Sequence, residues 1–471
     1  AASAQTLVSV QFPGTEVPIV SRQTGWAEQS PEEWWLNVQQ AICKAHATGL
    51  YDPAAISAIG IAYQMHGLVV VDKDQQVLRE SIIWCDSRAV PYGENAFAAI
   101  GKQKSLQHLL NSPGNFTAAK LAWVKDREPL VYAKADKIML PGDFIAMKLT
   151  GTVTTHISAL SEGIFWDFLT NEISEDVLRH FGFDRSLIPA IRPVFAPHGG
   201  LKADVGRALR LRPGIPVSYK AGDQPNNALS LGVMQPGEVA ANAGTSGVIY
   251  GVSDALTYDT RSRVNSFAHV NHTAASPRIG VLLCINGTGI MNRWIRDLTA
   301  GDTYAKRNEQ ALRIPAGSGG LSVLPFGNGA ERIFENRVIG AQLMDIDLNT
   351  HGPAHLYRAG QEGIAFAFRY GLDIMRENGM RPSVVRAGNA NMFLSPVFRE
   401  AFVNTTGVPV ELYNNEGSVG AALGAGIGAG IFRDEKEAFA GLKPLEWIAP
   451  RDAGVYEELY GRWKERLAKF L

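Results

Sequence analysis

The sequence predicts an α/β protein made of two domains, each with its own strands and helices. Its 471 residues are about three times the usual length of one domain. A strand and helix alternation occupies the first half of the chain, and the same alternation starts again after Asp223. A strand end, a glycine and a proline fall between the two halves, so we expect a hinge at residues 220–235. The cleft between two such domains is the default place for a ligand.

The first helix signal lies in the segment SPEEWWLNVQQAICKAHATG. Ser30 precedes Pro31 and a periodic apolar run, and Glu33 follows Ser30 by three residues. This is the pattern of an N-cap serine, a proline in the first helical position and a capping box. Gly49 then predicts the end of the helix.

The rest of the first domain reads as strands followed by helices. Three short β-branched runs are separated by turn residues, and we expect them to be adjacent strands of one sheet. They are residues 59–63, 68–71 and 82–84. Helical patterns follow at residues 105–110, 117–126 and 142–149.

The segment KAGDQPNNALSLG connects the two halves and contains one acidic residue, Asp223. A strand-like run precedes it, and a run of small apolar residues follows it. We therefore expect Asp223 where a strand ends and a helix begins. Its plain interpretation is an N-cap. Its functional interpretation is a general base that takes a proton from an attacking hydroxyl group.

The second domain repeats the order of elements. A glycine-rich pair of strands is predicted at residues 239–251 and a further strand at residues 278–283. Helices are predicted at residues 289–298 and 353–378.

The charges are balanced, with 45 basic and 46 acidic residues and a formal net charge of −1. Nucleic acids and anionic membranes would call for a basic patch or a basic amphipathic helix, so neither is expected as a partner. No stretch approaches the eighteen apolar residues of a membrane span, and the start of the chain lacks the pattern of a signal peptide. We expect a cytoplasmic protein with a small-molecule ligand.

Three glycine-containing turns are candidates for nucleotide binding. In NAGTSGVIYG, Gly244, Thr245 and Ser246 lie between two apolar runs. Free backbone amides and two hydroxyl groups can surround phosphate oxygens. An ordinary hairpin turn explains the same residues, since glycine and serine dominate tight turns.

The second turn is in INGTGIMNRWIRDL, where Gly287 and Gly289 stand between a strand and a helix. The pattern is not the dinucleotide fingerprint, because the third glycine and the distal acidic residue are missing. The helix N-terminus can still face a phosphate. A tight strand-to-helix turn is the plain alternative.

The third turn is in RAGNANMFLSPVFREAFVNTTGVPVEL. Gly388 ends a strand, and Asn389 and Asn391 open a helix that ends near Gly407. A glycine lets an aromatic base lie flat on the backbone, and asparagine amides can donate to the ribose or the purine edge. Helix capping alone also explains the asparagines.

In this order, these segments and several others resemble the FGGY family of carbohydrate kinases, and the resemblance runs essentially from end to end. The matching segments are GWAEQSPEEWW (25–35), QMHG (64–67), WCDSR (84–88), TAAKLAWVKD (117–126), AGDQPNNALSLG (221–232), AGTSG (243–247), HLYRAGQEGIAFA (355–367) and GSVGAALGAG (417–426). The resemblance implies two ribonuclease H-like domains of the actin, hexokinase and Hsp70 ATPase group. It places a sugar-binding domain at residues 1–230 and a nucleotide-binding domain at residues 231–471.

The resemblance also implies roles for individual residues. Asp223 is the catalytic base and reaches the metal only indirectly, through water or phosphate. The residues implied to bind the sugar are Met65, His66, Asp86 and Gln224. The residues implied to bind the nucleotide are Gly244, Thr245, Ser246, Gly289, Gly388, Asn389 and Asn391.

Two of the sugar residues have structural alternatives. His66 is either a sugar ligand or a buried histidine satisfied by backbone groups. Asp86 and Arg88 either order the sugar side of the cleft or only fix a strand end.

The implied activity is ATP-dependent phosphorylation of a ketose with Mg²⁺. The Gln-Met-His-Gly segment resembles the xylulokinase branch, which favours the O5 hydroxyl of D-xylulose as acceptor. Another ketose, a polyol or a sugar acid such as ribulose, fuculose or gluconate is the enzymatic alternative. A catalytically silent sugar- or ATP-binding protein is the other alternative. A homodimer is left open.

The sequence departs from the family pattern in three places. Gln224 stands where xylulokinases commonly have asparagine. Gly360 and Gln361 dilute the second family signature, and we expect an effect on packing. The family's first phosphate loop, an Asp-x-Gly-(Thr/Ser) turn, is missing before Ala1. We therefore expect the native protein to carry upstream residues, about 25 to 40 for the missing strands and turns.

Overall fold

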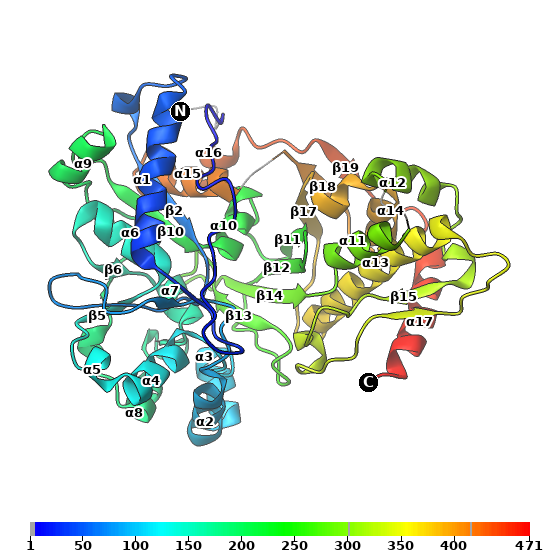
Figure 1. Ribbon diagram of the computed structural model, residues 1–471, viewed down its shortest axis with the longest axis horizontal. Coiled ribbons are helices and arrows are strands. Elements are labelled where there is room, and N and C mark those ends of the chain that lie inside the picture. Colours follow the sequence, from blue (N-terminus) through cyan, green and yellow to red (C-terminus); the bar gives the residue numbers. More distant parts are fainter. Residues whose placement is uncertain (1–4, 300–301, 415–416) are drawn as a thin grey trace. The chain divides into compact units, whose positions relative to one another are not determined.

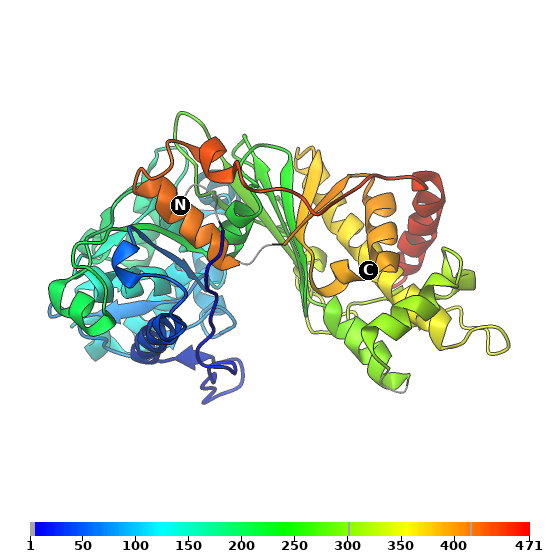
Figure 2. The same cartoon turned by 90° about the horizontal axis from the view of Figure 1, so that it is seen from above.

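The computed structural model describes residues 5–299, 302–414 and 417–471. The chain forms two compact units (Figures 1 and 2). The first contains residues 1–232, 267–279 and 416–442, and the second contains residues 233–266, 280–415 and 443–471. The chain thus passes from the first unit to the second between Gly232 and Val233.

The first unit combines short strands with many helices. Its strands are β1 (Glu28–Gln29), β2 (Ile59–Tyr63), β3 (Val69–Val71), β4 (Ser81–Ile82), β5 (Lys137–Met139), β6 (Thr154–Thr155), β7 (Trp166–Asp167), β8 (Glu172–Ile173), β9 (Ala190–Ile191) and β10 (Val217–Gly222). Its helices are α1 (Pro31–Ala47), α2 (Val90–Ile100), α3 (Lys102–Leu109), α4 (Thr117–Arg127), α5 (Pro129–Tyr132), α6 (Pro141–Thr150), α7 (Ile157–Glu162), α8 (Glu175–Phe181), α9 (Ala203–Leu209), α10 (Asp223–Ser230), α15 (Gly417–Gly428) and α16 (Glu435–Phe439).

The centre of the first unit is the parallel pair of β2 and β10, in which Tyr63 faces Gly222. Every residue of β10 is buried, and its one charged side chain, Lys220, is paired with the buried Asp143 at 2.6 Å. Helix α15 packs on this pair although it lies about 200 residues further along the chain (orange in Figure 2). The approach is close: a Cβ at Gly60 would lie 1.9 Å from the carbonyl oxygen of Ala421.

The second unit is built on a seven-stranded sheet with the order β13-β14-β12-β11-β17-β18-β19. Its strands are β11 (Glu238–Ala243), β12 (Gly247–Ser253), β13 (Asn265–Ala268), β14 (Ile279–Ile285), β17 (Val384–Gly388), β18 (Val410–Tyr413) and β19 (Glu446–Ile448). A hairpin of β15 (Ser322–Leu324) and β16 (Gln342–Met344) stands apart from this sheet. The helices are α11 (Gly289–Leu298), α12 (Tyr304–Leu312), α13 (Pro353–Glu377), α14 (Pro396–Thr406) and α17 (Ala453–Ala468).

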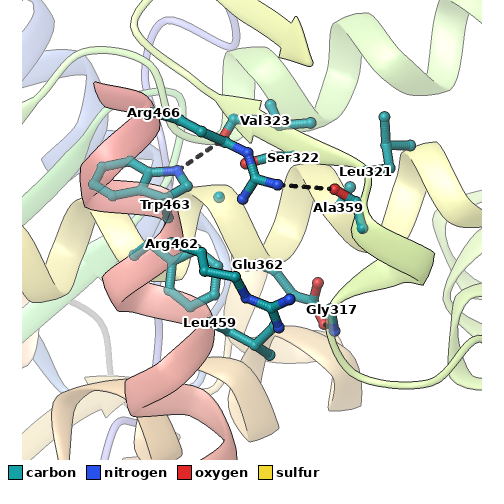
Figure 3. Close-up of a pocket in the computed structure, with 13 residues that line it drawn as sticks. Gly317, Leu321, Ser322, Val323, Ala359, Glu362, Leu459, Arg462, Trp463 and Arg466 are labelled. Carbon is teal, nitrogen blue, oxygen red and sulfur yellow. Dashed lines mark hydrogen bonds between the residues drawn. The ribbon is translucent and has the colours of Figure 1, made fainter. Parts of the chain in front are cut away.

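Helix α17 packs against α14 and α13 in the second unit, and its Trp463 reaches β15 (Figure 3). The indole of Trp463 is buried and donates to the carbonyl oxygen of Val323 at 2.9 Å. Arg466 donates to the carbonyl oxygen of Gly320 at 3.4 Å. The cavity among these residues measures about 30 Å³, which is room for about one water molecule. This corner of the unit is therefore core rather than a ligand site.

The structure corrects three local predictions. The helix at residues 31–47 is confirmed, but Ser30 makes no side-chain cap bond, so the predicted capping box is wrong. The first three predicted strands do not form one sheet: β2 pairs with β10, β3 with β5 and β4 with β1, although an isolated bridge between Leu68 and Ile82 makes the second and third predicted strands neighbours. Pairing over long sequence separations outweighs proximity along the chain here.

The third correction concerns the segment after Gly388. Asn391 begins a short 3₁₀ turn (Asn391–Leu394) instead of a long helix. Helix α14 starts afresh at Pro396, and the Ser395 hydroxyl accepts from the backbone N–H of Phe398. A serine followed by proline is the stronger helix start, which is the physical reason for the break.

Candidate active site

Asp223 lies at the carboxyl end of β10 and is the first residue of α10, as predicted. Its Oδ2 accepts from the side-chain Nε2 of Gln224 at 3.0 Å. The side chain still reaches solvent, but the protein atoms around it displace hydration water, which raises the pKa of the carboxyl. A carboxylate with a raised pKa and an accessible oxygen can accept a proton.

The parallel pairing of β2 and β10 brings the Gln-Met-His-Gly loop to Asp223. The carboxyl ends of parallel strands meet at one edge, so the loop after Tyr63 lies beside Gly222. A Cβ at Gly222 would lie 2.6 Å from Cγ of Met65 and 2.9 Å from Oε2 of Glu162. Only glycine therefore lets Met65 and Glu162 pack against the backbone next to Asp223.

His66 has a left-handed backbone conformation with φ of 61°. Its N–H donates to Oε1 of Glu162 at 2.9 Å, and its carbonyl oxygen accepts from Nζ of Lys120 at 2.7 Å. The ring contacts Phe116 and Phe267 at centroid distances of 4.8 and 5.4 Å. Strain of this kind costs about 1–3 kcal/mol and persists only where neighbours enforce it. The sequence pattern showed the loop but not this arrangement.

The groups that hold His66 are themselves buried. Burial raises the pKa of Glu162 well above its ordinary value, and the nearby carboxyl groups of Asp223 and Asp143 add to this. Burial lowers the pKa of Lys120 to about 7. Among the described residues, Oε2 of Glu162 has no hydrogen-bond partner. No local pattern in the sequence predicts a role for Glu162 or Lys120, because their positions depend on contacts with a distant loop.

Asp86 is completely buried beside Arg88. Its carboxylate accepts from the backbone N–H groups of Ala27 and Arg88 and from the Arg88 guanidinium. The same guanidinium lies 3.8 Å from the ring centroid of Trp26. These contacts use both carboxylate oxygens, which favours the alternative in which Asp86 fixes the end of a strand.

A pocket in the second unit brings together four of the predicted nucleotide residues. Its volume is about 370 Å³, within the usual range for small-molecule sites. It is lined by Ala243, Gly244, Thr245, Gly289, Ile290, Asn292, Arg293, Tyr304, Asn308, Asn391, Met392, Leu394 and Ser395. Ser246 belongs to the same turn as Thr245, but it is outside this lining.

The floor of the pocket is the turn between β11 and β12, with the start of α11 against it. The N–H groups of Gly289 and Ile290 donate to the carbonyl oxygens of Gly244 and Thr245 at 2.9 and 3.1 Å. A Cβ at Gly289 would lie 2.3 Å from the Gly244 oxygen. Glycine is required at position 289 because the two backbones approach closely. The turn of residues 244–246 and the turn that leads into α11 are therefore in direct contact.

Gly388 and Asn389 lie near Asn391 in sequence but do not line the pocket. The Asn389 side chain accepts from Arg399 at 2.9 Å, and its N–H donates to the Tyr413 carbonyl oxygen at 2.8 Å. Asn391 donates to the side chain of Asn242 at 3.5 Å. Of the two asparagines, Asn391 is thus the one that faces the pocket.

Several pocket residues were not predicted from the sequence. Asn292 and Arg293 follow Gly289 by three and four residues, so helix periodicity could have placed them on the same face. Tyr304 and Asn308 come from α12, and no local signal shows that this helix packs beside the β11–β12 turn.

The described residues include no group of three or more His, Cys, Asp or Glu side chains placed to hold a metal ion. Asp223 nevertheless offers a donor of the type that Mg²⁺ uses. This ion commonly takes one or two carboxylates together with water and substrate phosphates. In the described part of the chain, no helix has the length and apolar character needed to cross a bilayer.

Two family models cover most of the chain. The N-terminal domain model of the FGGY family of carbohydrate kinases matches residues 5–230, and the C-terminal domain model matches residues 239–429. The chain belongs to the FGGY family. The predicted family is thereby confirmed.

Relatives of this FGGY protein cover nearly its whole length. The xylulose kinase of Klebsiella pneumoniae is 29% identical over 89% of this chain and 85% of its own. The xylulose kinase of Escherichia coli (strain K12) is 28% identical over 89% of this chain and 84% of its own. The crystal structure of the xylulose kinase from Rhodospirillum rubrum matches with a TM-score of 0.84 and 25% sequence identity. The match covers 96% of this chain and 92% of that chain. These similarities confirm the predicted α/β fold of the actin and hexokinase group.

Proposed function

We propose that the protein transfers the γ-phosphoryl group of ATP to the O5 hydroxyl of D-xylulose, giving D-xylulose 5-phosphate and ADP. The observation that carries this proposal is the similarity to proteins named xylulose kinase over 89% of the chain. The Gln-Met-His-Gly loop beside Asp223 supports the same substrate class. As a kinase that uses ATP, the protein is expected in the cytoplasm.

Asp223 acts in this proposal as the general base. It takes the proton from O5 while the O5–P bond forms and the P–O bond to ADP breaks. Its raised pKa strengthens it as a proton acceptor, and Gln224 orients the carboxylate through its hydrogen bond to Oδ2. Bound Mg²⁺ would neutralise charge on the phosphates.

Met65 and His66 hold the sugar next to this base. Glu162 and Lys120 fix the backbone polar groups of His66, and the ring, with Nδ1 3.3 Å from the Glu162 carbonyl oxygen, packs between Phe116 and Phe267, so the imidazole is presented in one orientation. Such positioning supplies much of the rate enhancement in phosphoryl transfer. The turn of Gly244, Thr245 and Ser246 is proposed to approach the phosphates of ATP.

A coupled assay of ADP release tests the proposal. D-Xylulose, D-ribulose, fuculose, glycerol and gluconate are compared with ATP and Mg²⁺ at saturation. D-Xylulose should give the highest kcat/KM. A higher value for another acceptor would reassign the substrate. ATP binding without ADP release for any acceptor would instead indicate a silent binding protein.

A further inference from the structure

Gln361 is a completely buried polar residue in α13, behind the wall of the pocket in the second unit. Its departure from the family signature predicted an effect on packing. In the structure, its amide connects two residues that line the pocket, Asn308 from α12 and Ser395 at the start of α14. A buried polar side chain between two site residues can orient both of them.

The Ser395 hydroxyl sets the orientation of the Gln361 amide. It accepts from the N–H of Phe398 as the N-cap of α14, and it donates its hydrogen to Oε1 of Gln361 at 2.6 Å. With Oε1 used as an acceptor, Nε2 is the donor on the other side of the amide. It donates to Oδ1 of Asn308 at 3.0 Å.

This contact in turn orients Asn308. Its Oδ1 faces Gln361, so its Nδ2 is left to donate elsewhere. Asn308 is half-buried and lines the pocket, and among the described residues Nδ2 has no hydrogen-bond partner in the structure. The chain of contacts thus presents an N–H donor to whatever occupies the pocket.

We propose that Gln361 is a positioning residue for nucleotide recognition: through the bridge from Ser395 it holds the Asn308 amide so that Nδ2 donates to an acceptor atom of bound ATP. This inference rests on the proposed function, since it requires that the pocket binds the nucleotide. Asn308 is then a specificity residue that touches the substrate, and Gln361 acts only through it.

The test uses Gln361→Met, which conserves side-chain length and volume but removes both hydrogen bonds. Asn308→Ala, the double variant and a control, Gln342→Met, are made in the same full-length chain. Gln342 is a half-buried glutamine of the same unit that lies outside the pocket. The Kd of ATP is measured by calorimetry without sugar, and the KM of each substrate and kcat are measured by ADP release.

Gln361→Met and Asn308→Ala should each weaken ATP binding about 3- to 10-fold, the usual effect of one hydrogen bond. The double variant should lose no more than the larger single loss, because both changes remove the same contact. The KM of the sugar should stay at its wild-type value in these variants. The control variant, Gln342→Met, should keep the wild-type Kd of ATP.

Three outcomes would overturn the inference. ATP affinity of Asn308→Ala within twofold of wild type would show that the amide does not contact the nucleotide. An unchanged Kd in folded Gln361→Met would return Gln361 to a packing role, and additive losses would show that the two residues act separately. If the wild-type chain itself does not bind ATP, the proposed function fails as well, so the two failures are distinguishable.

Discussion

At the scale of single residues, two carboxyl groups near the Gln-Met-His-Gly loop have different surroundings. Asp223 keeps contact with solvent and accepts one side-chain hydrogen bond from Gln224. Glu162 is completely buried and supports the backbone of His66. These surroundings are consistent with the proposed role of Asp223 as proton acceptor, whereas Glu162 holds the loop.

Asp223→Asn should lower kcat by about 10²- to 10⁴-fold, because the amide cannot accept the O5 proton. Sugar and ATP affinities should stay near wild type, since the asparagine fills the same volume. The wild-type kcat should fall as the pH is lowered through the raised pKa of Asp223, because the protonated carboxyl is no longer a base. Steady-state kinetics at several pH values measure both effects. Turnover of the variant within a few-fold of wild type would contradict the assignment.

His66→Ala should raise the KM for D-xylulose about 3- to 10-fold through loss of one hydrogen bond to the sugar. The Kd of ATP measured separately should change little. His66→Asn is the matched control for folding, because asparagine adopts the left-handed conformation at low cost. If both variants melt early, the His66 ring is structural at this position, whereas early melting of His66→Ala alone reports the cost of the left-handed conformation.

At the scale of elements, Glu331 holds the turn that leads into α11. Its carboxylate is buried and accepts from the N–H groups of Asn286 and Gly287 at 3.0 and 3.2 Å. Burial raises the pKa of Glu331 to about 7. The folded state therefore keeps a proton that the unfolded state releases at lower pH.

The resulting contribution to stability is greatest below about pH 4.5 and is lost as the pH rises through about 7. Glu331→Gln does not titrate at this position. The free energy of unfolding of wild type, relative to this variant, should thus be higher at about pH 5 than at about pH 8 in urea denaturation. An equal difference at both pH values would show that the carboxyl does not titrate in this range.

Helix α15 shows how glycine sets the distance between elements. Gly424 lies against the buried ring of Tyr219, and a Cβ there would lie 2.5 Å from Cγ of that ring. Gly424→Ala should destabilise the protein by about 1–3 kcal/mol, because the packed core must shift.

The matched control for Gly424→Ala is Gly461→Ala in α17, where a Cβ meets no atom within 4 Å. It should stabilise the protein by about 0.5–1 kcal/mol through helix propensity. Thermal unfolding of both variants separates close packing from propensity, and a loss of stability at both positions would contradict the packing argument.

At the scale of the whole molecule, the first unit is completed by a segment from near the C-terminus. Ser218 donates to the carbonyl oxygen of Ala425 at 2.8 Å, and Asn226 donates to that of Gly417 at 2.7 Å. Without α15, the buried faces of β2 and β10 would meet solvent, and apolar surface of this kind costs about 25 cal/mol per Å².

A polypeptide of residues 1–232 should therefore lack a cooperative thermal transition and fixed near-ultraviolet circular dichroism. Joining residues 417–442 to it through a flexible linker should restore part of both signals. Cooperative, native-like unfolding of residues 1–232 alone would show that the first unit does not depend on α15.

Local patterns in the sequence predicted much of the chain correctly. The strand that ends at Gly222, the helix that begins with Asp223 and the hairpin around Thr245 all depend on residues within one turn of each other. Glycines, prolines and alternating side chains act over that range, so they are readable without a structure. Their order along the chain also identified the family.

Other features depend on contacts between residues far apart in sequence, and only the tertiary structure decided them. It paired β2 with β10, joined Asp86 to the backbone N–H of Ala27 and placed Gln361 between Asn308 and Ser395. It also added residues 416–442 to the first unit. Such contacts follow from the path of the backbone and the volume of the core, and no short window of sequence contains that information.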